Sequence, residues 1–284
     1  LEPYRIDGPA IISFSGGRTS AYMLHQIIAA HDGTLPDDVI VCFANTGKER
    51  PETLDFVQRC SEEWGVHIVW LEWRDDRQSA DGAKFEVVSH NSASRAGEPF
   101  AALIARKQFL PNPVTRYCTQ NLKIETIQRY NREVMGWPAW TEVVGLRADE
   151  PGRVLRTVNS KRKGPRTVVC PLSDAGVTER DVLAFWSRQA FDLQLQSYEG
   201  NCDLCFLKGA GKISRIMRER PDLAQWWIDQ EGQMMAAKGG AGTFRNDRPA
   251  YAALLDTTQR QGLLPFDVFD DRQDCETGCT DQEP

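Results

Sequence analysis

The sequence predicts an α/β protein whose parallel sheet is covered by helices on both faces. Continuous apolar runs at residues 10–12 and 39–44, and a further predicted strand at residues 67–71, alternate with polar loops and amphipathic helical patterns. Such runs are typical of parallel strands that are buried on both sides. Their alternation with helices indicates crossover units rather than hairpins. In sheets of this kind, ligands bind beyond the carboxyl ends of the strands.

Each element has its own local signal. The first helical pattern places Leu24, Ile27 and Ile28 on one face. Pro51 suits the first turn of a second helix, which is predicted over residues 51–64. Further along the chain, the patterns predict helices at residues 100–109, after Cys118 and at 178–189, and strands at residues 141–146 and 167–170.

The chain is expected to divide into three parts. Residues 1–200 form the α/β domain, residues 201–269 a smaller helical lobe that contains cysteines, and residues 270–284 an acidic tail. Within the first part, residues 72–99 are polar and rich in serine, and we expect an irregular insertion there.

The turn from Ser15 to Ser20 is the strongest local signal for function. It reads Ser-Gly-Gly-Arg-Thr-Ser and joins the first predicted strand to the first predicted helix. Glycines let a backbone curl tightly and bring its N–H groups close to a ligand. The helix N-terminus adds unpaired donors and the positive end of a dipole. The turn therefore predicts a phosphate site, against the alternative of an ordinary helix cap.

Composition excludes several classes of protein. The net charge of −6 argues against a protein that binds polyanions over its whole surface. The sequence contains no run of about 18 apolar residues, so it predicts no membrane span. Residues 1–9 carry charges and lack the apolar run of a secretion signal, so we expect a cytoplasmic location. In that reducing compartment, closely spaced cysteines indicate metal or redox sites rather than disulfides.

One local basic segment is a candidate nucleic-acid contact. It runs from Arg153 to Arg166 and is interrupted by Gly164-Pro165. The alternative is a solvated surface loop. The sequence does not predict the oligomeric state.

Further motifs follow the turn in a fixed order: Asn45-Thr46-Gly47 with Pro51-Glu52-Thr53, Arg116-Tyr117-Cys118 with Lys123, Gly145-Leu146-Arg147-Ala148-Asp149-Glu150 with Arg153, and Cys170-Pro171-Leu172. Together with the turn, which resembles the S-G-G-x-D-S PP-loop, they resemble the phosphoadenosine phosphosulfate (PAPS) reductase family. This family lies within the adenine nucleotide α-hydrolase-like superfamily. The resemblance covers residues 10–210 and implies a Rossmann-like, doubly wound parallel sheet of five strands.

The resemblance also implies an adenine nucleotide, either ATP or a sulfonucleotide such as adenylyl sulfate (APS) or PAPS. Its binding residues would be Ser15, Gly16, Gly17, Arg18, Thr19, Ser20, Asn45, Thr46, Gly47, Lys123, Arg147 and Arg153. Arg147, also a catalytic candidate, and Arg153 would reach phosphate or sulfate oxygens, unless they pair with Asp149 and Glu150. Thr19 departs from the family pattern, because it replaces the acidic residue that could hold a metal.

Four cysteines are candidate metal ligands. Cys202 and Cys205 form a C-x-x-C pair, and Cys118 and Cys170 lie upstream. Four thiolates suit a [4Fe–4S] cluster or Zn²⁺. The resemblance to cluster-bearing APS reductases is incomplete, because those enzymes carry a Cys-Cys pair where this chain has Cys118-Thr119. Unligated thiols are the remaining interpretation.

Cys275 lies in the acidic tail and loosely resembles the nucleophile of sulfonucleotide reductases. Neighbouring carboxylates raise a thiol pKa, which favours a tail without a redox role.

Three functions remain open at this point. The first is ATP-dependent sulfur transfer to an acceptor, which the basic segment slightly favours. The second is reduction of a sulfonucleotide with release of sulfite, supported by a thiol reductant. The third is a nucleotide-binding or nucleic-acid-binding module without turnover.

Overall fold

A computed structural model describes residues 2–260 except 80, 83, 161–163 and 241. Six strands form one sheet in the order β4-β3-β2-β1-β5-β6. Their bounds are β1 Ala10–Ser13, β2 Val39–Asn45, β3 Ile68–Trp73, β4 Phe85–Val88, β5 Trp140–Val144 and β6 Arg166–Val169. All neighbouring pairs are parallel except β3 and β4. The predicted α/β class is therefore correct.

The prediction of five strands is corrected to six. The additional strand, β4, lies within residues 72–99, where an irregular insertion was expected, and pairs antiparallel with β3 so that Leu71 lies opposite Val87. β4 is a short edge strand in which only Val88 is buried. Its sequence therefore lacks the continuous apolar run that marks the central strands β1 and β2.

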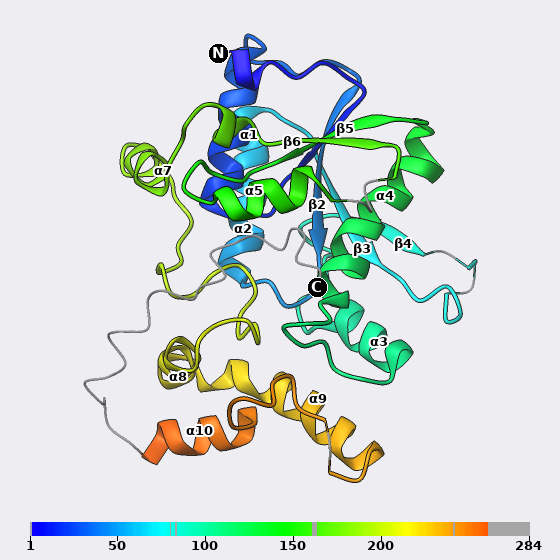
Figure 1. The fold of residues 1–284 in the computed structure, drawn as a ribbon, viewed down its shortest axis with the longest axis vertical. Coiled ribbons are helices and arrows are strands. Elements are labelled where there is room, and N and C mark those ends of the chain that lie inside the picture. The colour runs from blue at the N-terminus through cyan, green and yellow to red at the C-terminus, as the bar shows by residue number, and fades with distance from the viewer. Residues whose placement is uncertain (1, 80, 83, 161–163, 241, 261–284) are drawn as a thin grey trace.

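Helices follow the strands and cover both faces of the sheet (Figure 1). In the α/β part they are α1 Arg18–Ala30, α2 Pro51–Trp64, α3 Glu98–Lys107, α4 Thr126–Tyr130, α5 Pro151–Val158, α6 Pro171–Asp174 and α7 Glu179–Trp186. Two π-helical stretches, Cys118–Glu125 and Asn131–Met135, flank α4. Short 3₁₀ turns occupy Glu2–Tyr4 and Pro221–Leu223.

Side chains of β1 alternate between two hydrophobic clusters, one on each face of the sheet. Ile12 belongs to the cluster that includes residues of α1, α2 and α7. Ile11 belongs to the cluster that includes Ile127 of α4. Both isoleucines are fully buried. This period of two explains why the strand is apolar at both positions.

The C-terminal helices are α8 Ala210–Glu219, α9 Ala224–Ala237 and α10 Tyr251–Arg260, and they lie below the sheet in Figure 1. Trp227 packs against Phe244 and Tyr251 at the centre of their hydrophobic cluster. The same cluster includes Phe100 of α3 and Leu122, so the lobe shares its core with residues before 200. The boundary at residue 200 stays a prediction.

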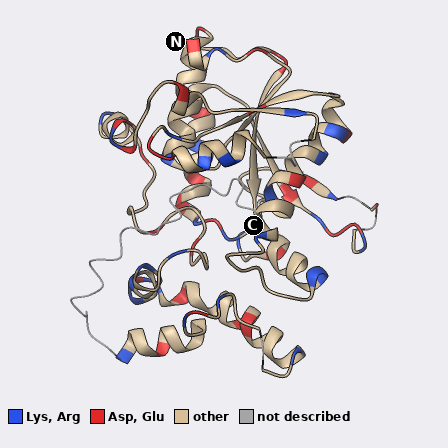
Figure 2. Ribbon diagram, viewed as in Figure 1, with Lys and Arg blue, Asp and Glu red and all other residues tan. Residues whose placement is uncertain are grey.

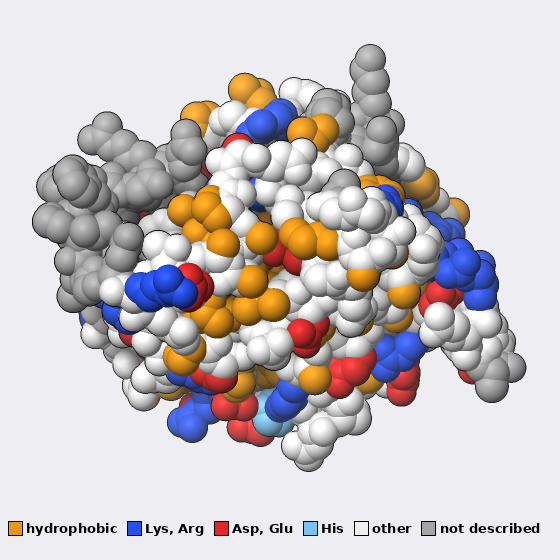
Figure 3. All heavy atoms as spheres, turned by 90° about the horizontal axis from the view of Figure 1, so that it is seen from below, with side chains coloured by type: hydrophobic (Ala, Val, Ile, Leu, Met, Phe, Trp, Pro, Cys, Tyr) orange, Lys and Arg blue, Asp and Glu red, His pale blue; other side chains and the backbone are white. Residues whose placement is uncertain are grey.

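Seen from below, hydrophobic side chains lie near the middle of the visible face, and most Lys and Arg lie towards its rim (Figure 3).

Among the described residues, no helix combines the length and the apolar character needed to cross a bilayer.

Candidate functional site

The turn between β1 and α1 has the geometry of an anion site. Gly16 adopts a φ of 78°, which favours glycine, and a Cβ there would lie 2.7 Å from Cγ2 of Thr53. The hydroxyl of Ser20 accepts hydrogen bonds from the amide of Ser15 at 3.2 Å and from its hydroxyl at 2.9 Å. Gly17 is the N-cap of α1, and no side chain caps this helix. The amides of the first turn are therefore left for a ligand.

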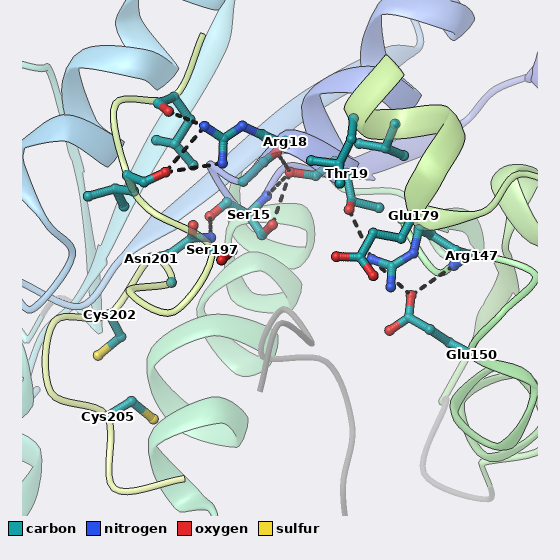
Figure 4. A pocket seen from close by; sticks show the side chains of 18 of the residues that line it. Ser15, Arg18, Thr19, Arg147, Glu150, Glu179, Ser197, Asn201, Cys202 and Cys205 are labelled. Atoms are coloured by element: carbon teal, nitrogen blue, oxygen red, sulfur yellow. Dashed lines mark hydrogen bonds and ion pairs between the residues drawn. The ribbon is translucent and has the colours of Figure 1, made fainter. Parts of the chain in front are cut away.

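A cavity opens in front of this turn (Figure 4). Several segments contribute to its wall: the turn, the π-helical stretch after Cys118, the loop after β5, the start of α7 and residues 193–208. The predicted site residues that line it are Ser15, Gly17, Arg18, Thr19, Ser20, Lys123, Arg147, Arg153, Cys202 and Cys205. Gly16 shapes the turn from behind and is not part of the wall. The carboxyl ends of β1 and β5 thus meet at one cavity, as expected for parallel strands.

Two arginines, Arg147 in the loop after β5 and Arg153 in α5, contact one carboxylate at the cavity wall. The amide of Arg147 donates to Glu150 at 3.0 Å, and the guanidinium of Arg153 donates to the other oxygen of the same carboxylate. Arg147 also donates to Asp149 at 2.9 Å and to the hydroxyl of Thr19 at 3.3 Å. Burial opposes ionisation of Asp149, but hydrogen bonds from the Glu179 amide and Arg147 hold its pKa below the usual value. The predicted alternative of ion pairing with Asp149 and Glu150 is therefore found at the cavity wall, and the predicted contact with phosphate or sulfate oxygens stays a prediction.

Arg18 directs its guanidinium along the wall, to a neighbouring loop. It donates to both carboxylate oxygens of Asp192, at 2.7 and 2.8 Å, and to the carbonyls of Leu193 and Leu195. The indole of Trp186 donates to the carbonyl of Arg18 at 2.9 Å. Arg18 therefore fixes the loop that follows α7 against the turn.

The loop after β2 lies beside the cavity wall and is internally satisfied. Asn45 is fully buried and donates to Glu72 at 2.6 Å, and Gly47 donates its amide to the Asn45 side chain at 3.1 Å. Thr46 donates to Glu49, which also pairs with Lys123 at 3.2 Å. Asn45, Thr46 and Gly47 are not among the residues that line the cavity. Their predicted contact with a nucleoside stays a prediction.

Cys202 and Cys205 lie on the loop that continues from Asn201, where both are half-buried and line the cavity (Figure 4). Their side chains hydrogen-bond to each other. This bond, with Lys208 and the amide of Leu207, lowers the pKa of Cys205 to about 6. The same bond and burial raise the pKa of Cys202. The pair therefore combines a thiolate with a protonated thiol.

Of the other two candidate ligands, Cys170 lies in a different hydrophobic cluster, whereas Cys118 and Cys202 pack against the same one. Cys170 packs with Val144 and Leu146, and burial raises its pKa to about 12. Cys118 packs against the cluster of the C-terminal lobe. In the described part of the chain, no group of three or more His, Cys, Asp or Glu side chains is placed to hold a metal. The predicted four-cysteine set is not assembled, because Cys170 faces the core beside β6; it fits neither a [4Fe–4S] cluster nor Zn²⁺.

Comparison with known proteins identifies the family. The phosphoadenosine phosphosulfate reductase domain matches residues 9–194. The chain belongs to this family. A curated relative, the uncharacterized nin region protein ORF290 of Escherichia phage lambda, is 30% identical over 216 residues, which cover 75% of this chain and 71% of that protein.

Two solved structures are similar at lower identity. PAPS reductase from Candida auris, in a phosphate complex, is 18% identical with a TM-score of 0.41, covering 66% of this chain and 75% of that chain. The U34-tRNA thiolase NcsA from Methanococcus maripaludis, with its [4Fe–4S] cluster, is 12% identical with a TM-score of 0.41, covering 88% of this chain and 71% of that chain.

Two further predictions for this PAPS reductase family member concern Cys275 and the basic segment from Arg153 to Arg166. Cys275 lies outside the described residues. The basic segment is not a continuous exposed patch: Arg153 pairs with Glu150, and Arg166 is buried and ion-paired with Glu142. Figure 2 shows Lys and Arg interspersed with Asp and Glu along most elements. Residues 161–163 lie outside the described residues.

Sequence reasoning missed several residues of the site. Asn201 donates to the carbonyl of Ser15 at 2.8 Å and so joins the C-x-x-C loop to the turn. Lys208 donates to the carbonyl of Cys202. Glu179 contributes a carboxylate to the wall. The position of Lys208, three residues after Cys205, was the one signal that could have found it, because a nearby cation stabilises a thiolate.

Proposed function

We propose that this protein is an enzyme that binds an adenine nucleotide in the cavity and carries out sulfur-transfer chemistry on it. One observation carries the proposal: the anion-binding turn and two thiols line the same cavity. A nucleotide-binding module without turnover has no use for thiols at this position.

The anionic end of the nucleotide is assigned to the turn and its neighbours. Uncapped amides at the start of α1 suit phosphate oxygens. Arg147 and Arg153 offer guanidinium groups whose planar geometry matches phosphate and sulfate. Lys123 adds an ammonium group at the same wall. The negative ligand would exchange with the carboxylate of Glu150, which forms ion pairs with both guanidinium groups.

Within this class, a sulfonucleotide is the substrate that the cavity supports best. A thiolate is a strong nucleophile for sulfur, and Cys205 is a cavity thiol with a lowered pKa. No carboxylate stands at position 19, where the family usually carries one, so Mg²⁺-assisted chemistry on ATP has less support. The basic segment, which favoured an acceptor such as a nucleic acid, has lost Arg153 and Arg166 to internal ion pairs.

ATP-dependent sulfur transfer remains the second candidate, because the PP-loop turn suits the phosphates of ATP as well. In that version ATP activates an acceptor oxygen by adenylylation, and a sulfur nucleophile then displaces AMP.

Titration and product analysis test the proposal. The reduced protein is titrated calorimetrically with ATP, APS and PAPS, and the products are then measured. Sulfite release identifies the reductase version, whereas AMP and pyrophosphate from ATP identify the transferase version. Binding without any product would leave the non-catalytic module. If none of the three nucleotides binds, the proposal is wrong.

A further inference from the structure

We infer that the nucleoside half of the nucleotide lies against α7, where Glu179 accepts hydrogen bonds from the ribose hydroxyls and selects against a nucleotide that carries a 3′-phosphate. The inference rests on the proposed function, because it requires an adenine nucleotide in the cavity. It narrows the substrate class to nucleotides with free ribose hydroxyls, such as APS or ATP, and excludes PAPS.

The carboxylate of Glu179 is a charge at the cavity wall that the protein leaves without a partner. The residue is half-buried at the start of α7 and lines the cavity. Its backbone amide donates to Asp149 at 2.9 Å, but its carboxylate takes part in no hydrogen bond or ion pair within the described part of the chain. An acceptor that faces a cavity in this way can take hydroxyl donors from a ligand.

Glu179 lies next to the place assigned to the anionic end of the nucleotide. Asp149 accepts hydrogen bonds both from the Glu179 amide and from the guanidinium of Arg147, each at 2.9 Å. Arg147 in turn donates to Thr19 of the turn at 3.3 Å. In the view of Figure 4, Glu179 lies on the Thr19 side of the turn, and the C-x-x-C loop lies on the other side. The ribose, which is bonded directly to the 5′-phosphate, can therefore reach Glu179.

The apolar part of the cavity wall begins one helical turn beyond Glu179. Val182 and Leu183 follow it at spacings of three and four residues, which places all three on one face of α7. Leu193 and Leu195, from the loop after α7, complete this part of the wall. The side chain of Leu183 is 49% exposed, so it offers apolar surface that a ligand can cover. A planar base suits such a wall, because binding removes its apolar faces from water.

The order of these groups along the cavity matches the order of groups in a nucleotide. The turn suits the phosphates, Glu179 the ribose and the leucines the base. The alternative place for the nucleoside is the loop after β2, but Asn45, Thr46 and Gly47 bond within their own surroundings and do not line the cavity.

The charge of Glu179 turns this placement into selectivity. A carboxylate accepts a hydrogen bond from a ribose hydroxyl, whereas it repels a phosphate at the same position. Each cation that lines the cavity is already engaged by an oxygen: Arg18 by Asp192, Lys123 by Glu49, Arg147 by Asp149, Arg153 by Glu150 and Lys208 by the carbonyl of Cys202. A second phosphate on the ribose therefore meets the charge of Glu179 directly.

Two ligands that differ only in the 3′-phosphate test the selection. The reduced full chain is titrated calorimetrically with AMP and with adenosine 3′,5′-bisphosphate. We expect the wild-type protein to bind AMP about tenfold more tightly, because the second phosphate is repelled at the wall. Glu179→Gln keeps the size of the side chain and an oxygen acceptor but removes the charge, so the ratio of the two affinities should fall to about two or less. The same titrations with APS and PAPS, which differ in the same phosphate, make the comparison independent of the affinity for AMP.

Glu133→Gln is the control for the loss of a negative charge. Glu133 is exposed on the π-helical stretch Asn131–Met135 and does not line the cavity. This variant should keep the wild-type ratio.

A pair of exposed leucines tests the place of the base. Leu183→Ala removes apolar surface from the cavity wall and should weaken AMP binding about fivefold. Leu155→Ala is the control, because Leu155 is 62% exposed on α5 and does not line the cavity. It should bind AMP as the wild type does, and circular dichroism should show that both variants are folded.

Other outcomes overturn the inference in distinguishable ways. If the wild-type protein binds the 3′-phosphorylated ligands as tightly as the others, or if Glu179→Gln leaves the ratio unchanged, the selection is wrong and the nucleotide site stands. If Leu183→Ala binds AMP as tightly as Leu155→Ala does, the base does not lie against α7. If no adenine nucleotide binds to the wild-type protein, the proposed function itself fails.

Discussion

The cavity has two walls that are built in different ways. The phosphate wall, formed by Ser15–Ser20 with Arg147 and Arg153, combines contacts between near neighbours, such as Ser15 with Ser20, with long-range contacts, such as Arg147 with Thr19. The thiol wall, residues 196–208, depends on contacts with distant parts of the chain, such as Asn201 with Ser15. The local contacts of the first wall can be predicted from sequence motifs, whereas the long-range contacts of both walls, on which the thiol wall depends more, form only in the complete fold. Breaking one wall should therefore have different consequences from breaking the other.

The largest expected effect is on the attachment of the thiol wall. Lys48→Met leaves the carboxylate of Asp203 buried without its ammonium partner. Removing one member of a buried ion pair costs about 3–5 kcal/mol of unfolding free energy. Urea denaturation measures the loss. The control is Arg59→Met, which removes an exposed ion pair with Glu63 and should cost less than about 1 kcal/mol. Equal losses in the two variants would contradict the role assigned to the Lys48–Asp203 pair.

The next effect concerns the phosphate wall. Arg147→Ala removes a guanidinium from the cavity and should weaken nucleotide binding by about 1.5–3 kcal/mol, or roughly 10–100-fold, the usual range for a charged hydrogen bond. Calorimetry measures the change, and circular dichroism should show an intact fold. Arg129→Ala is the matched control. It removes an ion pair between Arg129 of α4 and Glu125 of the π-helical stretch Cys118–Glu125. Unchanged affinity in Arg147→Ala would remove this residue from the site.

A smaller effect separates crowding from backbone strain in the turn. Gly16 and Gly33 both have positive φ, but of the two only Gly16 would bring a Cβ against other atoms. Alanine at either position should cost about 1–2 kcal/mol for the left-handed conformation. Gly16→Ala should cost about 1–3 kcal/mol more because of overpacking, and it should also weaken nucleotide binding. Thermal denaturation of both variants provides the comparison, and equal stabilities would show that the turn tolerates a side chain.

The smallest expected effect is a difference in alkylation rate between a thiol in the cavity, Cys205, and a thiol in the core, Cys170. The pKa of Cys205 is about 6, so its thiolate fraction rises through pH 6 and is nearly complete at neutral pH. Alkylation by iodoacetamide should follow that profile and exceed, about two- to threefold at pH 7, the rate of an ordinary thiol with a pKa of about 8.5, because lower nucleophilicity partly offsets the larger thiolate fraction. Cys170, whose pKa is raised to about 12 by burial, should stay unmodified in the folded protein. Peptide mass spectrometry reads both sites, and a Cys205 profile centred at pH 8 or above would contradict its assigned surroundings.

The sequence predicted what depends on local pattern. Residues 51–64 form α2 as expected, because a proline at the first turn and an apolar face act locally. The Ser15–Ser20 turn was predicted with its backbone geometry because glycine and hydroxyl spacing determine that geometry. The strand Phe85–Val88 was missed because an exposed edge strand has no continuous apolar run.

The direction in which a side chain points was harder to predict than the presence of a helix or strand. Cys170 and Cys205 were treated alike from spacing, although one faces the core beside β6 and the other faces the cavity. The sequence gave no signal for Asn201, because its side chain bonds to the backbone carbonyl of Ser15, and every residue has such a carbonyl.

The hydrogen bond from Asn201 to Ser15 also has a consequence for synthesis on the ribosome. The turn and the strands that support it lie within the first 169 residues and can begin to assemble while the rest of the chain is still being translated. Cys202 and Cys205 emerge later, so a growing chain acquires its anion cradle before its reactive sulfur atoms. A product truncated before residue 200 would contain the turn, and it would lack both cavity thiols and the helices that share a core with Phe100 and Leu122.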